Sequence, residues 1–96
     1  MMNAVLDARR MNTRAKAHAY LAAKCGFPAY YGSNLDAAFD LLSTAGEMRI
    51  ILKYPGALEK NLGDYGLRFL EMFTLAAQIN ANLVFEVVKS AKKAGE

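Results

Sequence analysis

Two short and almost wholly apolar runs restrict the fold of this chain more than any other feature. Residues 48–54 read MRIILKY, and residues 82–88 read NLVFEVV. Runs of this length that are rich in branched apolar residues are typical of β-strands covered on both faces. The stretch between them, residues 55–81, is far longer than a hairpin turn. The two strands are therefore expected to be parallel and joined by helices.

A third strand and about four helices complete the predicted order. Residues 3–8 (NAVLDA) form an opening strand. Strands that alternate with helices predict an α/β fold, here a three-stranded parallel sheet with the helices packed mainly on one face. In the last helix, Leu67 and Phe73 are among the residues expected to face the core. Apolar spacing and capping residues place the helices over residues 13–26, between a cap at Ser33 or Asn34 and Gly46, and over residues 55–63 and 65–80.

Length and composition restrict the class of protein. Ninety-six residues, 54% apolar and 22% charged, suit one globular domain over residues 1–96, with a frayed tail over about residues 90–96. The single cysteine, Cys25, cannot form a disulfide within the chain. The N-terminus is unlike a secretory signal, and no apolar run approaches the roughly 20 residues of a membrane span. We therefore expect a cytoplasmic protein with no membrane partner.

The charge balance is a weak guide to the partner. A formal net charge of +3 permits weak binding to nucleic acid. The basic residues are dispersed along the sequence, however, and do not form the cluster that is typical of a nucleic-acid site. Nucleic acid is therefore not expected to be the main partner.

The sequence lacks the usual patterns of catalytic and metal sites. The only histidine, His18, lies in a predicted helix with no acidic residue within one turn, which favours a packed or surface residue. Cys25 falls in the last turn of the same helix, where the dipole disfavours a thiolate. Asp36 and Asp40 are too few to hold a metal ion alone, and no glycine-rich phosphate loop is present. We therefore expect no enzyme activity, no cofactor and no metal site.

One segment has a charge opposite to that of the whole chain. Between Lys24 and Arg49 there is no lysine or arginine, whereas Asp36, Asp40 and Glu47 all lie there. Asp36 and Asp40 are one turn apart on the predicted helix, and like charges at this spacing destabilise an isolated helix by a few tenths of a kcal/mol. Because this arrangement destabilises the helix, it favours a functional role for Asp36 and Asp40. The segment predicts a docking surface for a cationic partner.

A simpler interpretation of this segment is a capped helix with a solvated acidic face. Under that interpretation Tyr30, Tyr31 and Phe39 are core residues. The grouping of aromatic, amide and carboxylate side chains within residues 30–40 instead matches an interface hot spot, in which aromatic anchors surround charges that lose water on binding.

Residues 27–40, FPAYYGSNLDAAFD, resemble the signature of the barstar family, which are intracellular inhibitors of a secreted ribonuclease. The family pattern is an apolar residue, Pro, any residue, Tyr-Tyr-Gly, any residue, Asn-Leu-Asp-Ala, and then an aromatic residue and Asp at this spacing. The order of predicted elements also agrees along essentially the whole chain. The resemblance implies a barstar-like α/β fold and an inhibitor of a small cationic, barnase-like ribonuclease, such as an immunity protein for a toxin.

The resemblance also implies roles for single residues. Asp40 would take the place of an RNA phosphate against the basic residues of the enzyme, and Asp36 would meet a second basic site. Tyr30 would pack near the catalytic histidine of the nuclease. The interface implied in full is Tyr30, Tyr31, Gly32, Asn34, Leu35, Asp36, Phe39, Asp40, Ser43 and Glu47.

Some positions depart from the family pattern. Phe39 and Ala45 stand where the namesake of the family carries tryptophans, Leu75 stands where a glutamate is expected, and Lys53 replaces another acidic residue. The chain is also basic overall, whereas the namesake is acidic. These departures leave the identity of the nuclease open. The alternative is a barstar-like module that binds another protein, or nucleic acid weakly, without inhibiting a ribonuclease.

Overall fold

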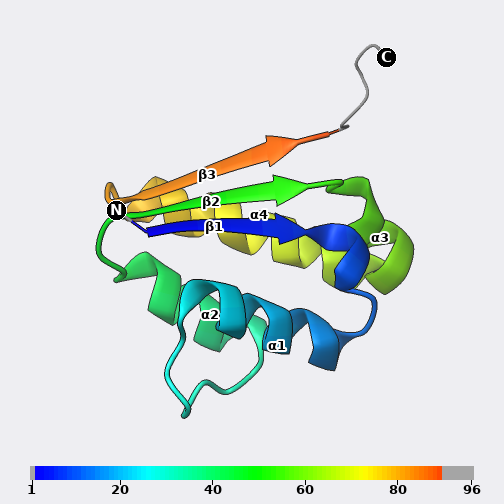
Figure 1. The fold of residues 1–96 in the computed structure, drawn as a ribbon, viewed down its shortest axis with the longest axis horizontal. Helices are drawn as coiled ribbons and strands as arrows, with labels where there is room; N and C mark the ends of the chain where they lie inside the picture. The colour runs from blue at the N-terminus through cyan, green and yellow to red at the C-terminus, as the bar shows by residue number, and fades with distance from the viewer. Residues whose placement is uncertain (1, 90–96) are drawn as a thin grey trace.

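The computed structural model describes residues 2–89, and the frayed tail expected over about residues 90–96 lies outside them. Its elements follow the predicted order, with one additional 3-10 turn, η1, after the first strand (Figure 1). The elements are β1 (Met2–Asp7), η1 (Ala8–Arg10), α1 (Arg14–Cys25), α2 (Leu35–Ser43), β2 (Met48–Lys53), α3 (Gly56–Leu62), α4 (Asp64–Ile79) and β3 (Leu83–Val88).

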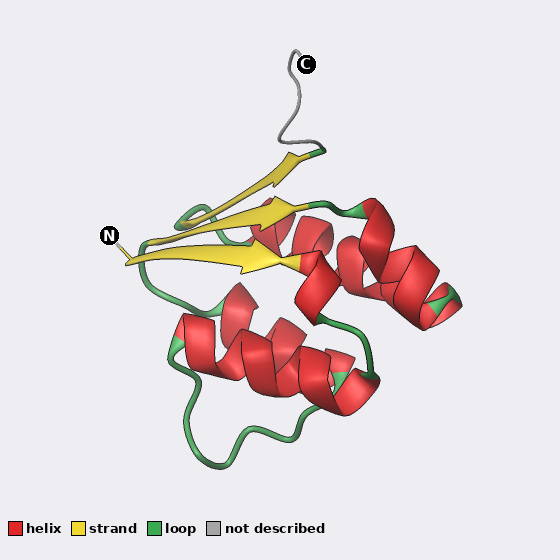
Figure 2. Ribbon diagram, turned by 45° about the vertical axis from the view of Figure 1, so that its right-hand side comes forward, coloured by secondary structure: helices red, strands yellow, loops and turns green. Residues whose placement is uncertain are grey.

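The three strands form one parallel sheet in the order β1-β2-β3. Met2 pairs with Met48, Met48 pairs with Leu83, and the same register continues along all three strands. The helices lie on one side of this sheet (Figures 1 and 2). The predicted α/β fold, with a three-stranded parallel sheet and four helices mainly on one face, is therefore confirmed.

The face of the sheet turned away from the helices is open, and the expectation of strands covered on both faces was wrong. Along β2, Ile50 and Leu52 are fully buried, whereas Ile51 between them is only partly buried. Val5 and Val84 are 42% and 39% exposed. Branched residues favour a pleated strand whether or not both of its faces are covered, so the apolar run does not report on the second face.

The buried face of α4 agrees with the predicted one at Phe73 and differs from it at Leu67. Phe69, Met72, Phe73 and Ala76 are buried, whereas Leu67 is 44% exposed. Because apolar residues lie on most sides of this helix, periodicity alone does not fix which side is buried. The buried side is the one that meets α2, α3 and the sheet.

Asn80 fastens the end of α2 to the end of α4. Its side chain is 8% exposed, and its amide nitrogen donates hydrogen bonds to the carbonyls of Leu42 and Ala45, both at 2.9 Å. Its amide oxygen accepts a bond from the Asn82 N–H at 3.0 Å. The carbonyls at the C-terminus of a helix lack hydrogen-bond donors within the helix. The Asn80 side chain provides donors at the end of α2.

Replacing Asn80 with alanine is expected to lower the free energy of unfolding by about 1–3 kcal/mol, because the Ala45 carbonyl loses its side-chain donor and the Leu42 carbonyl keeps the longer bond from the Ala45 N–H, at 3.4 Å. Urea unfolding followed by circular dichroism measures the change. Asn82→Ala is the matched control: Asn82 is exposed, and its substitution should change stability by less than about 0.5 kcal/mol. Equal unfolding midpoints for the two variants would show that Asn80 does not hold α2 in place.

Candidate functional site

The start of α2 is set by a side-chain cap. The Asn34 side-chain oxygen accepts a hydrogen bond from the Ala37 N–H at 2.8 Å, so Asn34, and not Ser33, is the cap. A Cβ atom on Gly32 would lie 3.2 Å from the Asn34 amide nitrogen, closer than most real contacts. Gly32 therefore permits a close approach, while the left-handed backbone is at Ser33, with φ 56°. The cap fixes where the helix begins and which way its side chains point.

The two aspartates form a ridge on the outer side of α2. Asp36 and Asp40 are exposed and one turn apart, while Ala38 and Leu42 on the opposite side are fully buried. Phe39 is partly buried and packs against the core. The predicted spacing of Asp36 and Asp40, one turn apart on a helix, is present in the structure.

Two hollows flank this acidic ridge. The first has a volume of about 150 Å³ and joins Asp40 to the loop before the helix. The second has a volume of about 320 Å³ and lies between α2 and α4. The first is lined by Tyr30, Tyr31, Gly32, Ala37, Asp40 and Leu41, and the second by Leu35, Asp36, Phe39, Arg68, Glu71, Met72 and Leu75.

Three of the candidate interface residues line neither hollow, and the first of them, Asn34, is the cap of α2. The Ser43 hydroxyl donates to the Asp40 carbonyl at 3.2 Å, so it closes the last turn of α2. Glu47 is exposed in the segment that leads into β2. The structure brings Asn34 and the candidates that line the hollows together around the ridge, and it leaves Ser43 and Glu47 at its far end.

Tyr30 and Tyr31 have different environments. Tyr30 is 82% exposed, so the core interpretation does not hold for it. Tyr31 is partly buried, and its ring packs edge-on against Phe27 at 4.8 Å between centroids. An exposed aromatic ring held next to a carboxylate is a common anchor in protein interfaces.

A buried histidine holds the Tyr31 end of the loop. His18 of α1 is 1% exposed, which confirms the packed interpretation. Its Nδ1 lies 2.5 Å from the Tyr31 hydroxyl, and its Nε2 lies 2.7 Å from the Tyr65 hydroxyl on α4. The Tyr31 hydroxyl also donates to the Asn34 carbonyl at 3.5 Å. With Nδ1 protonated, His18 donates to Tyr31 and accepts from Tyr65, so every polar group of the neutral ring is paired.

This network ties the loop to two helices of the scaffold. Burial raises the pKa of both tyrosine hydroxyls, so Tyr31 and Tyr65 stay protonated and able to donate at neutral pH. The Arg14 guanidinium lies 4.2 Å from the centre of the Tyr65 ring and covers it. The loop that presents Tyr30 is therefore fixed to α1 and α4 before any partner binds.

The protein is expected to become less stable as the pH is lowered, because His18 is buried. Burial lowers the pKa of His18 below its ordinary value of 6.5. The unfolded chain therefore takes up a proton at higher pH than the folded chain, and the free energy of unfolding decreases as pH drops below about 6.5. The slope is at most about 1.4 kcal/mol per pH unit for one such group.

Urea unfolding at several pH values between about 7 and 5 tests this linkage. His18→Gln keeps a hydrogen-bonding side chain but does not titrate, so the slope should flatten in this variant. The same slope in both proteins would assign the pH dependence to other groups. The range avoids the region in which carboxylates titrate.

The sequence did not point to Arg68 and Glu71 of α4, which line the second hollow with Asp36. Their spacing, with Leu75 one turn further, is that of one helix face. That spacing was visible in the sequence, but nothing local shows that this face meets α2. Glu71 adds a second carboxylate to the hollow, beside Asp36, and Arg68 adds a cation, while Leu75 adds an apolar side chain.

The side chain of Cys25 is buried. Burial raises the pKa of the Cys25 thiol to about 12, so it stays protonated at neutral pH. Within residues 2–89, no group of three or more histidine, cysteine or acidic side chains is placed to hold a metal ion. None of the helices in that part of the chain has the length and apolar character needed to cross a membrane.

Comparison with known proteins bears on the fold as a whole. A search of curated proteins gives no significant match. A family model described as Barstar (barnase inhibitor) matches residues 1–90 of the 96-residue chain. This range includes every strand and helix described above and both hollows of the acidic ridge. The chain therefore belongs to the barstar family.

Proposed function

We propose that this chain, acting as a single domain, inhibits a small cationic ribonuclease by placing the acidic ridge of α2 in the active site of the enzyme. Proteins of the barstar family are inhibitors and not enzymes. In this proposal Asp36 and Asp40 occupy positions that RNA phosphates take in the nuclease. The inhibitor would act inside the cell that makes the nuclease, as an immunity protein does.

The absence of ion pairs at the ridge, within the described residues, carries this proposal, although Arg68 lines the same hollow as Asp36. Within residues 2–89 the ion pairs are Asp7–Arg9 and Arg49–Glu86, so neither Asp36 nor Asp40 has a cation within 4 Å. A ribonuclease must hold cations where phosphate binds. Carboxylates on a rigid helix can use the same field, both to guide the encounter and to stabilise the complex.

The supporting structure suits a surface that is organised before binding. The Asn34 cap fixes the start of α2, and the contact of Tyr31 with His18 fixes the preceding loop. A surface that is already ordered loses less conformational entropy on binding, which raises affinity. The first hollow, beside Asp40, and the exposed Tyr30 ring give a basic side chain of the enzyme both a charge and an apolar contact.

The proposal is tested by titrating the protein into a panel of small cationic microbial ribonucleases, barnase included. Calorimetry should show one-to-one binding that weakens as salt is added, and RNA cleavage should stop at the equivalence point. A panel without binding would remove the support for a barnase-like partner. Binding to RNA whose steep salt dependence survives loss of both Asp36 and Asp40 would favour the nucleic-acid alternative.

A further inference from the structure

The third strand is an edge of the sheet that carries little charge between Leu83 and Val88, and Lys89, which follows it, lines the adjoining groove. β3 pairs with β2 on one side and, within the described chain, has no strand on its other side. Proteins usually protect such an edge with charges, proline or a bulge. Glu86 is the only charged residue between Leu83 and Val88, and its carboxylate is already bound to Arg49 at 2.8 Å.

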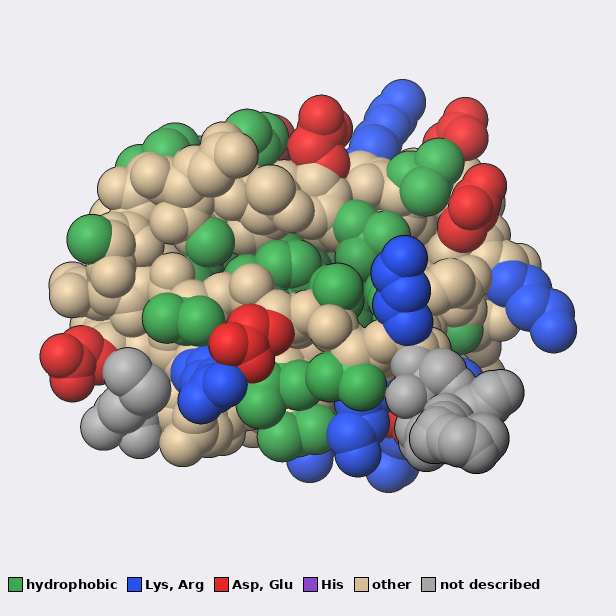
Figure 3. Space-filling view, turned by 90° about the horizontal axis from the view of Figure 1, so that it is seen from above, with side chains coloured by type: hydrophobic (Ala, Val, Ile, Leu, Met, Phe, Trp, Pro, Cys, Tyr) green, Lys and Arg blue, Asp and Glu red, His purple; other side chains and the backbone are tan. Residues whose placement is uncertain are grey.

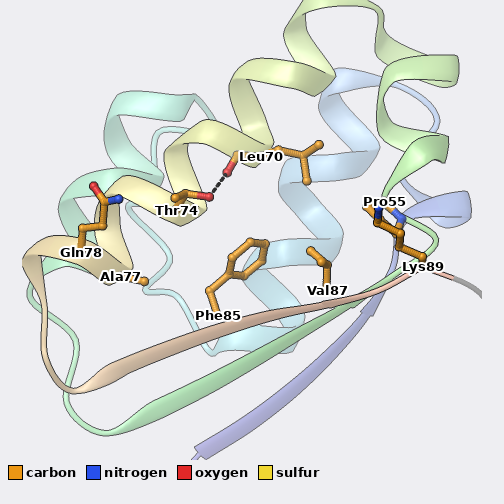
Figure 4. A pocket seen from close by; sticks show the side chains of 8 residues that line it. All are labelled: Pro55, Leu70, Thr74, Ala77, Gln78, Phe85, Val87 and Lys89. Carbon is orange, nitrogen blue, oxygen red and sulfur yellow. Dashed lines mark hydrogen bonds between the residues drawn. The ribbon is translucent and has the colours of Figure 1, made fainter.

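A groove beside this edge extends the apolar surface. Figure 4 shows Leu70 and Ala77 of α4 along one wall and Phe85 and Val87 of β3 along the other. The groove has a volume of about 580 Å³. Figure 3 looks onto the β3 side of the molecule and shows hydrophobic side chains gathered across its middle. Val87 is 45% exposed although it points to the helical side, so the sheet is incompletely covered here.

Alternate backbone groups of β3 point out of the edge. The carbonyls of Asn82 and Val88 accept hydrogen bonds from the neighbouring β2 side. Because this direction alternates along a strand, the N–H and C=O groups of Phe85 and Val87 point outward. The carbonyl of Leu83 does so too, whereas its N–H is bonded within the turn before the strand. These groups can form hydrogen bonds with one further strand.

We propose that this further strand is β3 of a second copy of the chain, antiparallel to the first across a two-fold axis. β3 suits this role because its inward residues Leu83, Phe85 and Val87 are all apolar. With Phe85 opposite its counterpart, Leu83 lies opposite Val87, and all inward pairs are apolar. The two Phe85 residues exchange two hydrogen bonds, and each Val87 N–H reaches the Leu83 carbonyl of the other copy.

Charge selects this register over one of its two neighbours. In the proposed register Val84 lies opposite Glu86 of the second copy. A shift that brings Val87 opposite Phe85 would place the two Glu86 side chains directly opposite each other, and like charges in that position destabilise a sheet. The two-fold axis stands perpendicular to the sheet, so both sets of helices lie on one face. The α2 ridges lie away from β3 and stay accessible (Figure 1).

The register gives a sharp test at position 84. Val84→Glu places a carboxylate opposite Glu86 twice in each dimer, whereas Val84→Lys places an ammonium group there. Sedimentation equilibrium of the full chain should show a monomer–dimer equilibrium. The glutamate variant should dimerise roughly 5- to 30-fold more weakly than the lysine variant.

The two substitutions should affect the stability of the monomer in the opposite order. An effect on dimerisation can therefore be distinguished from an effect on folding. Within one chain position 84 pairs with Arg49 on β2, so a glutamate there should support the monomer fold and a lysine should oppose it. Weaker dimerisation of Val84→Glu therefore cannot come from loss of folding. Val87→Lys, which charges the groove, should reduce dimerisation, whereas Val5→Lys at the other edge of the sheet should not.

Three outcomes would overturn the proposal. The first is a protein that sediments as a monomer at all concentrations. This outcome counts against the proposal even if an extended peptide binds at the groove. The second is a dimer that Val84→Glu and Val84→Lys affect equally. The third is a dimer that Val87→Lys leaves unchanged, since its interface must then lie elsewhere.

Discussion

Replacing Asp40 with alanine is expected to weaken binding to the cognate ribonuclease by about 2–4 kcal/mol, or roughly 30- to 1,000-fold. Asp40 is exposed, has no cation within 4 Å in the described chain, and lines the first hollow next to Tyr30. In the proposed complex it loses water only when a cation of the enzyme replaces that water. Removing the carboxylate would leave this cation buried without a partner.

This expected loss of binding free energy is typical of hot spots in protein interfaces, and barnase–barstar is among the complexes from which the range is drawn. Calorimetry of Asp40→Ala, Asp40→Asn and Glu59→Ala separates the causes. Asp40→Asn keeps the shape and removes the charge, so it should lose most of the same affinity. Glu59→Ala removes an exposed carboxylate on α3 and should change binding by less than about 0.5 kcal/mol. A loss for Asp40→Ala as small as that for Glu59→Ala would contradict the proposed role of the ridge.

Replacing Gly66 with alanine is expected to lower the free energy of unfolding by about 3 kcal/mol or more. Gly66 lies buried in the first turns of α4, where the backbone of α3 crosses it. A Cβ atom at this position would be 2.1 Å from the Leu58 carbonyl oxygen and 2.9 Å from the Glu59 backbone nitrogen. Neither neighbour is a flexible side chain, so α3 must move away from α4. A loss of this size is a large part of the roughly 5–15 kcal/mol that stabilises a typical domain.

Gly56 provides a matched control for this prediction. It lies at the start of α3, has no left-handed φ, and has no atom within 4 Å of the point that a Cβ would occupy. Gly56→Ala should leave stability unchanged or raise it by about 0.4–1 kcal/mol, because alanine restricts the unfolded chain and favours the helix. Urea unfolding compares the two variants. A Gly66→Ala midpoint equal to that of the parent protein would show that α3 and α4 can separate freely.

The order of elements was predictable because its signals are local. The apolar runs of β2 and β3 and the Thr13 cap of α1 each lie within a few residues. The acidic stripe of Asp36 and Asp40 was predictable for the same reason, since one helical period defines it. These features depend on neighbours along the chain and not on the packing of distant segments.

The contacts that hold the site depend on distant segments. His18 meets Tyr31 and Tyr65 from two other parts of the chain, and no spacing rule joins these three residues. Gly66 looks like an ordinary glycine within a helix until α3 is seen to cross it. The open face at Val84 was missed because its residue type suits both a covered and an exposed strand.

Every strand pairing in this sheet joins segments that are far apart in the chain. Met2 lies beside Met48, Met48 lies beside Leu83, and helices occupy both connections. Topologies dominated by such non-local contacts fold more slowly than helical domains of similar size, because loop-closure entropy is lost before the contacts form. During synthesis β2 lacks its second neighbour until residues 83–88 have left the ribosome. A complete sheet, and with it a firmly supported α2, is available only once β3 has emerged.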